Sequence, residues 1–163
     1  MKKTVRIPYP LSLLLVLLMI GGVGTLLIHW LLKSEQPSRY LPNYQTSLHE
    51  GRWVPDQFPH DIIEIYEQHD LDTRDVWLAF QHGQQGMAIQ GYRKVGREDV
   101  RVTRPYDANW WFKTLPENYS FYRGECDVSA NNQAVSGEST LAMSGDSPVV
   151  YWWCQPNGRV SLQ

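Results

Sequence analysis

Several common sequence signals are missing from this chain of 163 residues. It has only two cysteines, and no CxxC, HExxH or HxH spacing that would indicate a redox or zinc site. It also has no G-x-S-x-G and no Ser-x-x-Lys, which are motifs of serine hydrolases. The sequence therefore carries no catalytic signature, and it predicts no cofactor.

Positive charge is scarce after the N-terminal segment 1–33. That segment holds four of the 15 basic residues and no acid, which leaves 11 basic and 17 acidic groups in 34–163. Non-specific binding to nucleic acid depends on clustered lysine and arginine, so nucleic acid is not a predicted partner. The length of the segment 34–163 suits a single average domain rather than two full cores.

Charged residues are absent from 11–32, which is rich in leucine, isoleucine and valine. As a helix this segment would reach about 33 Å, enough to cross a hydrocarbon core of about 30 Å. Three basic residues precede it and favour a cytoplasmic N-terminus: Lys2, Lys3 and Arg6. The bulky sequence at 28–32 differs from a signal cleavage site, and no nearby cysteine offers a lipid anchor. These features predict a cytoplasmic N-terminus (1–10), a transmembrane signal anchor (11–32), a tether (33–50) and an exported domain (51–163).

Cys126 and Cys154 both lie in the predicted exported domain. In an oxidising compartment such a pair tends to form a bridge, so a structural disulfide is predicted. The alternative is a redox or nucleophilic thiol, which would need a CxxC pair or a histidine beside the cysteine.

Secondary-structure patterns in the exported domain favour strands. Residues 62–68 fit either a short helix or a strand, but the turn at 70–73 and the alternation of Val76, Leu78 and Phe80 favour a hairpin. A short helix is predicted at 84–95. Further strands are predicted at 99–103, 121–127, 140–144 and 149–154, with a turn at Asn131-Asn132. The predicted fold class is α+β: one N-terminal transmembrane helix, then a small, mostly antiparallel sheet of about five strands with one or two short helices.

A resemblance to a loose group of proteins covers about residues 53–155. It rests on these residues, in order: Pro55, Phe58-Pro59, Ile62, Asp72-Thr73, Trp77, Phe80, Trp110-Trp111 and Val149–Trp152. Together they resemble small bacterial envelope proteins of unknown function, which carry a signal, a lipobox or a single membrane helix. The resemblance implies a periplasmic α+β domain and no known activity, and this chain departs from the lipoprotein members by lacking a lipidation cysteine.

The seven tryptophans are the most informative side chains for binding. Trp110 and Trp111 follow a predicted loop, where they could anchor a protein interface, stack on a sugar ring or enter a bilayer surface. Neighbouring residues of a strand point to opposite faces, so one of Trp152 and Trp153 is expected in the core and the other at water, a helix or a partner. Trp110, Trp111 and Trp153 are the candidate binding residues, with use as core bulk as the alternative.

His60, His69 and Asp72 are weak candidates for a metal site, because two histidines and a carboxylate suit zinc. The alternative is that these histidines are exposed on turns, and no metal is predicted. Asp70, Asp72 and Asp75 would form an acidic face able to meet a basic partner.

The sequence as a whole predicts a single-pass protein of the bacterial inner membrane with a periplasmic interaction domain. Its role would be that of an accessory subunit of an envelope complex, or of an immunity-type inhibitor of a toxin. The alternatives are a membrane-tethered envelope hydrolase that uses His60, His69 or nearby acids, and a module that binds glycans. An enzyme is the less favoured of these interpretations.

Overall fold

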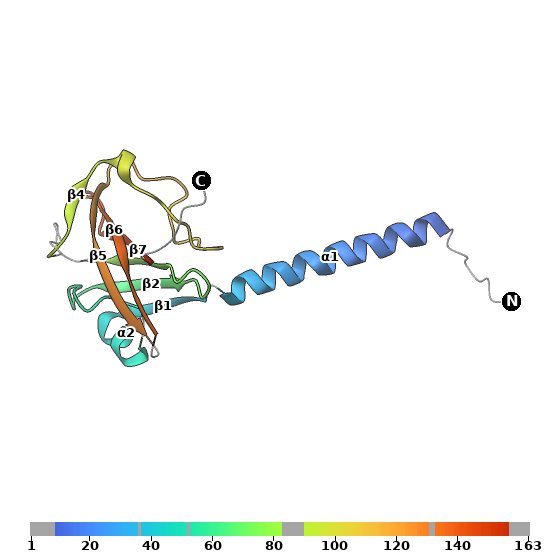
Figure 1. Ribbon diagram of the computed structural model, residues 1–163, viewed down its shortest axis with the longest axis horizontal. Helices are drawn as coiled ribbons and strands as arrows, with labels where there is room; N and C mark the ends of the chain where they lie inside the picture. Colours follow the sequence, from blue (N-terminus) through green and yellow to red (C-terminus); the bar gives the residue numbers. More distant parts are fainter. Residues whose placement is uncertain (1–8, 36, 52, 83–89, 131–132, 157–163) are drawn as a thin grey trace. The chain divides into compact units, whose positions relative to one another are not determined.

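The structure is a computed structural model that describes residues 9–35, 37–51, 53–82, 90–130 and 133–156. The chain divides into two compact units, Met1–Ser34 and Glu35–Gln163. Helix α1 (Tyr9–Glu35) accounts for the described part of the first unit (Figure 1). Among the described residues, no helix combines the length and the apolar character that a membrane crossing requires. Helix α1 confirms that the predicted segment 11–32 is helical. Its passage through a membrane stays a prediction.

The second unit is built on one antiparallel sheet of seven strands within the described residues, with the order β1-β2-β3-β7-β6-β5-β4. The strands are β1 (Ser38–Asn43), β2 (Ile63–His69), β3 (Val76–Gln81), β4 (Arg93–Val95), β5 (Ser120–Ala130), β6 (Gln133–Met143) and β7 (Val149–Pro156). Helix α2 (Tyr44–Glu50) and the 3-10 helix η1 (Arg97–Asp99) complete the unit. This architecture confirms a mostly antiparallel sheet with short helices, although it has more strands than the sequence predicted.

The predicted hairpin is present, because β2 pairs antiparallel with β3. A bulge interrupts β2 at Glu64, which has a positive φ of 51°. The extra residue places Ile62 and Ile65 on the same buried face although they are three positions apart, and it leaves Ile63 46% exposed. The bulge therefore explains why this segment also fits a helical period.

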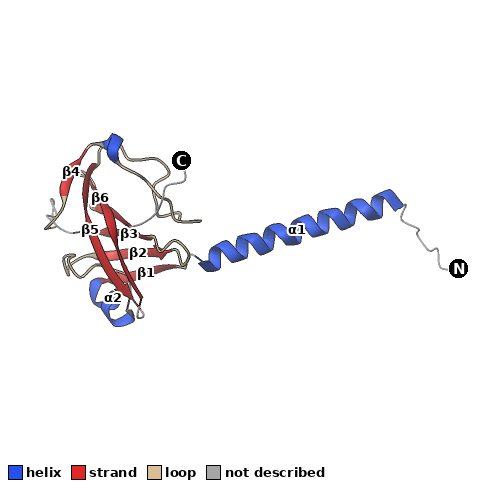
Figure 2. Ribbon diagram, viewed as in Figure 1, coloured by secondary structure: helices blue, strands red, loops and turns tan. Residues whose placement is uncertain are grey.

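Two hydrophobic clusters occupy the two faces of the sheet. The first joins Leu41, Ile65 and Leu78 to Val128 and Leu141 of the long strands, which run steeply across β1–β3 in Figure 2. The second cluster is aromatic and contains Trp77, Trp111, Phe121 and Trp153, with parts of the segment 95–119 packed against it. Because both faces are covered, the central strands are buried on both sides.

The predicted tether (33–50) is wrong from residue 38 onward. Strand β1 pairs with β2 along its length, and Leu41 and Tyr44 are each only 1% exposed. Helix α2 begins at the cap residue Asn43, whose side chain accepts a hydrogen bond from the Thr46 backbone N–H. It ends at Gly51, which has a φ of 60°. A few well-placed apolar side chains thus hold a polar segment on the domain.

Two other predicted elements differ in the structure. Of the predicted helix 84–95, residues 84–89 lie outside the described residues, and Arg93–Val95 form strand β4. The predicted strand 99–103 is absent, because η1 occupies Arg97–Asp99 and residues 100–103 are irregular. Val100 and Val102 alternate because both pack against the aromatic cluster from a loop. The predicted strands at 121–127, 140–144 and 149–154 correspond to β5, β6 and β7, and the predicted turn Asn131-Asn132 lies outside the described residues.

Cys126 of β5 and Cys154 of β7 form the predicted disulfide, with their Cα atoms 6.0 Å apart. Both residues are buried in the first cluster, with 2% and 0% exposure. The bridge therefore lies inside the core and has a structural role.

Candidate functional site

Trp110 is the one of the three candidate tryptophans that lies partly at the surface. Its ring stacks on Tyr66, with centroids 5.9 Å apart, and its Nε1 donates to the Ser38 hydroxyl oxygen at 3.3 Å. Tyr66 also contacts Tyr40 of β1 at 5.2 Å. Tyr40, Tyr66 and Trp110 together form an aromatic patch.

Trp111 and Trp153 are core residues, with 6% and 0% exposure. Their rings meet edge to face at 5.7 Å, and Trp153 Nε1 donates to the Arg101 carbonyl oxygen at 2.9 Å. Trp152 is buried as well, on the opposite face of β7. Strand alternation does not separate a core tryptophan from a binding one here, because the sheet is covered on both faces.

The structure places the candidate metal ligands in separate surroundings. His60 stacks on Tyr44 at 4.5 Å, and His69 Nδ1 lies 3.3 Å from Glu67 Oε1. Asp72 is exposed in the β2–β3 turn. Across the described ranges, no group of three histidine, cysteine or acidic side chains is arranged to hold a metal ion.

The predicted acidic face is not continuous. Asp70 Oδ1 accepts the backbone N–H groups of Asp72 and Thr73, at 2.9 and 2.7 Å, and so shapes the turn. Asp75 is only 2% exposed. Of the three acids proposed to meet a basic partner, Asp75 belongs to the interior and Asp72 is exposed.

A charged cleft of about 560 Å³ lies at the other end of the sheet, over β4, β5 and β6. Its lining residues are Gln57, Gln90, Gly91, Tyr92, Arg93, Arg123, Gly124, Glu125, Gly137 and Glu138. No pattern in the sequence predicted this cleft. Arg93 and Arg123 are thirty positions apart and belong to no motif, and only the pairing of β4 with β5 brings them together.

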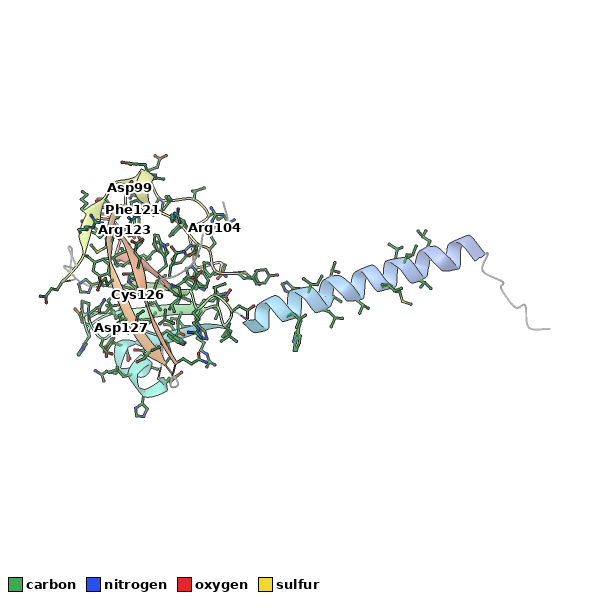
Figure 3. All side chains as sticks on the ribbon, in the orientation of Figure 1. Asp99, Arg104, Phe121, Arg123, Cys126 and Asp127 are labelled. Carbon is green, nitrogen blue, oxygen red and sulfur yellow. A yellow bond between two sulfur atoms is a disulfide. The ribbon has the colours of Figure 1, made fainter. Side chains whose placement is uncertain are left out.

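Like charges face each other across the strands of this cleft. Arg93 is directly opposite Arg123 in the β4–β5 pair, and Glu125 is directly opposite Glu138 in the β5–β6 pair. Like charges in such positions destabilise a sheet. One diagonal contact offsets this in part, because Arg123 Nε lies 3.4 Å from Glu138 Oε1. Arg123 also donates from Nη2 to the Asp99 carbonyl oxygen, and Figure 3 labels both residues.

A buried chain of hydrogen bonds fixes the wall of the cleft. Trp152 Nε1 donates to the Tyr92 hydroxyl oxygen at 2.8 Å, and Tyr92 Oη lies 2.5 Å from Ser139 Oγ. Ser139 Oγ donates in turn to the Gly124 carbonyl oxygen at 3.2 Å, so the Tyr92 hydroxyl must donate to Ser139. Burial raises the pKa of Tyr92 above its ordinary value of 10, and hydrogen bonds with Ser139, Trp152 and Gln57 lower it in part.

The packing around Gly124 also depends on Tyr92. A Cβ at residue 124 would lie 2.9 Å from the Tyr92 ring, so the glycine allows this ring to approach the sheet. Tyr92 therefore joins the cleft wall to the core from both its ring and its hydroxyl.

Comparison with known proteins gives a partial match to a protein family. A family model, the YbbD head domain, matches residues 42–81, which is less than half of the chain. This family of small bacterial domains is consistent with the resemblance to uncharacterised envelope proteins. The match assigns no activity to the chain. The matched segment contains α2 and the β2–β3 hairpin. Neither the curated proteins nor the solved structures include a match to this chain.

Proposed function

We propose that this chain is a single-pass protein of the bacterial inner membrane whose periplasmic domain binds a protein partner through the charged cleft. It would act as an accessory subunit of an envelope complex or as an immunity-type inhibitor. The observation that carries the proposal is that like charges are paired across the strands of the cleft, Arg93 with Arg123 and Glu125 with Glu138.

The charge arrangement suits a polypeptide better than a small ion. Arg93, Glu125 and Glu138 are exposed, so their charges are available to a partner, while Arg123 is partly buried. A partner with an acidic group over the arginines and a basic group over the glutamates would relieve both repulsions. Complementary charges of this kind determine specificity and association rate more than affinity.

The anchor is supported by the sequence and by the surface of α1. Residues 11–32 hold no charged residue, and the described large apolar side chains from Leu14 to Leu31 are 47–70% exposed. Apolar side chains that are this exposed favour an apolar surrounding. A bilayer would supply it, and the basic residues before the helix favour a cytoplasmic N-terminus.

The geometry supports the hydrolase alternative less well. It assigned catalysis to His60, His69 or nearby acids, and the two histidines contact different aromatic rings, Tyr44 and Trp53. The glycan alternative relied on two adjacent tryptophans, of which Trp111 is buried.

The test is photo-crosslinking of the full-length protein in cells with a photoreactive residue in place of Gln90, an exposed and uncharged residue of the cleft lining. A second protein with this residue at His49, which is exposed on α2, is the control for random capture. We expect a discrete protein adduct from position 90 and none from position 49.

Two charge reversals then identify the contact. Arg93→Glu should remove the adduct, and Lys94→Glu should keep it, because Lys94 is exposed one residue away and does not line the cleft. An adduct that survives Arg93→Glu, or equal capture from positions 90 and 49, would refute binding through the cleft.

A further inference from the structure

The aromatic patch lies at the opposite end of the sheet from the charged cleft. Tyr40 is on the edge strand β1 and Tyr66 on the neighbouring strand β2, whereas the cleft lies over β4, β5 and β6. Tyr40 is 53% exposed and Tyr66 is 37% exposed, so two large aromatic rings face the surroundings. Neither Tyr40 nor Tyr66 lines the charged cleft.

The patch is held rigidly. Trp110 lies edge-on to the buried Trp111 at 5.6 Å. The loop before it is fixed to the sheet by Gln68, whose Nε2 donates to the Tyr106 carbonyl oxygen at 2.8 Å. The three rings are therefore positioned before any contact is made, which reduces the entropy lost on binding.

The patch is also close in the chain to the end of α1. Trp110 donates to Ser38, the first residue of β1, and Ser38 follows the last residue of α1, Glu35, by three positions. Three residues span at most about 11 Å when fully extended. If α1 crosses the membrane, Ser38 and the Trp110 ring beside it must stay near the bilayer surface.

From this continuity we infer that the aromatic patch contacts the lipid interface on the exported side of the membrane. Tryptophan and tyrosine favour this region, because it accommodates an apolar ring and a polar N–H or O–H together. The contact would hold the aromatic patch against the bilayer. The inference rests on the proposed anchor and does not depend on the partner of the cleft.

The distribution of tryptophans makes this inference measurable. Five of the seven are buried in the domain, with exposures of 0–6%: Trp53, Trp77, Trp111, Trp152 and Trp153. Trp110 is partly exposed and Trp30 of α1 is 65% exposed. A quencher placed in the lipid should therefore reach only Trp30 and Trp110.

The experiment uses the full-length protein in vesicles of phosphatidylethanolamine and phosphatidylglycerol, with part of the lipid brominated near the top of an acyl chain. In the Trp30→Phe protein we expect strong quenching of fluorescence by the brominated lipid. In the protein with both Trp30→Phe and Trp110→Phe, this quenching should fall to the background level. Near-ultraviolet circular dichroism of both proteins checks that the aromatic core is intact.

A third protein separates the anchor from the patch. In Trp110→Phe, quenching of Trp30 reports whether α1 enters the bilayer. If Trp30 is quenched but Trp110 is not, the anchor holds and the lipid contact of the patch is refuted. If Trp30 is not quenched and alkaline carbonate extracts the protein, the anchor fails and this inference fails with it. A last measurement is acrylamide quenching of Trp110 in detergent at increasing protein concentration. If acrylamide quenches Trp110 less as the protein concentration rises, the patch binds a second copy of the chain instead.

Discussion

Cys126 and Cys154 are bridged although strand β6 lies between their own strands, β5 and β7. In a flat sheet, strands two positions apart are about 9.6 Å from each other, since neighbours are about 4.8 Å apart. Here the two Cα atoms are 6.0 Å apart. Gly137 of β6 is paired with Cys126 on one side and Pro156 on the other. The residue beside the bridge therefore has no side chain.

We expect Gly137→Ala to disrupt the domain. A Cβ at this position would lie 1.9 Å from the Gln155 carbonyl oxygen and 2.8 Å from the Pro156 Cα, and both are backbone atoms that cannot rotate away. Forced overpacking of this kind costs typically about 1–3 kcal/mol and can cost more. The measurement is the urea midpoint of the full-length protein in detergent, together with the fraction of disulfide formed. Gly145→Ala is the matched control, because nothing lies within 4 Å of its added Cβ. Equal midpoints for the two variants would contradict the close approach of β6 to β7.

We expect Tyr92→Phe to lower the free energy of unfolding by about 1–3 kcal/mol, because the variant removes the acceptor of the buried Trp152 Nε1–H. The hydroxyl it removes accepts a hydrogen bond from Trp152 Nε1 and contacts Ser139 Oγ. Tyr66→Phe is the control, since the Tyr66 ring is 37% exposed and lies outside this chain of hydrogen bonds. The same urea titration measures both. A loss in Tyr92→Phe no greater than in Tyr66→Phe would show that the hydroxyl contributes nothing to the fold.

The stability of the domain should also fall in strong alkali. Burial raises the pKa of Tyr92 in the folded state above 10, the value expected in the unfolded chain. As the pH rises past about 10, the Tyr92 hydroxyl loses its proton in the unfolded chain before it does so in the folded one. The free energy of unfolding therefore decreases above about pH 10, and this ionisation does not affect it at lower pH. Absorbance of phenolate against pH measures the ionisation directly. The protein has nine tyrosines. In Tyr92→Phe, the absorbance change above pH 10 should be smaller by the contribution of one tyrosine. An unchanged high-pH region in that variant would exclude Tyr92 as its source.

Local patterns were enough to predict the hairpin and the disulfide. Alternation of Val76, Leu78 and Phe80 identifies β3, since successive side chains of a strand point to opposite faces. A lone pair of cysteines in a domain predicted to be exported favours a bridge between them, and Cys126 and Cys154 form one. Both inferences use properties that lie within a few residues or depend on count alone.

The cleft could not be predicted in this way, because it depends on the register between distant strands. Arg93 and Glu125 become neighbours of Arg123 and Glu138 only after β4, β5 and β6 have paired. Whether Trp153 is a core or a binding residue stayed open in the sequence for a related reason. Alternation places Trp152 and Trp153 on opposite faces, but it does not show that the segment 95–119 covers the second face.

The different positions of Trp110 and Trp111 give a last prediction. Trp111 is 6% exposed and meets Phe112, Tyr151 and Trp153 within the aromatic cluster, at centroid distances of 4.7–5.7 Å. Trp111→Ala should therefore cost about 3–5 kcal/mol of stability, as expected for a large aromatic removed from a core. Trp110→Ala should cost about 1 kcal/mol, because its ring is partly exposed.

Urea titrations followed by circular dichroism measure the two losses without depending on the fluorescence of the removed residue. A cost for Trp110→Ala as large as that for Trp111→Ala would mean that Trp110 is part of the core. Such a result would also weaken the proposed contact of Trp110 with lipid, because that contact requires an exposed ring. A small cost for Trp111→Ala would reopen Trp111 as a binding residue, because a side chain that contributes little to stability is free to serve a partner.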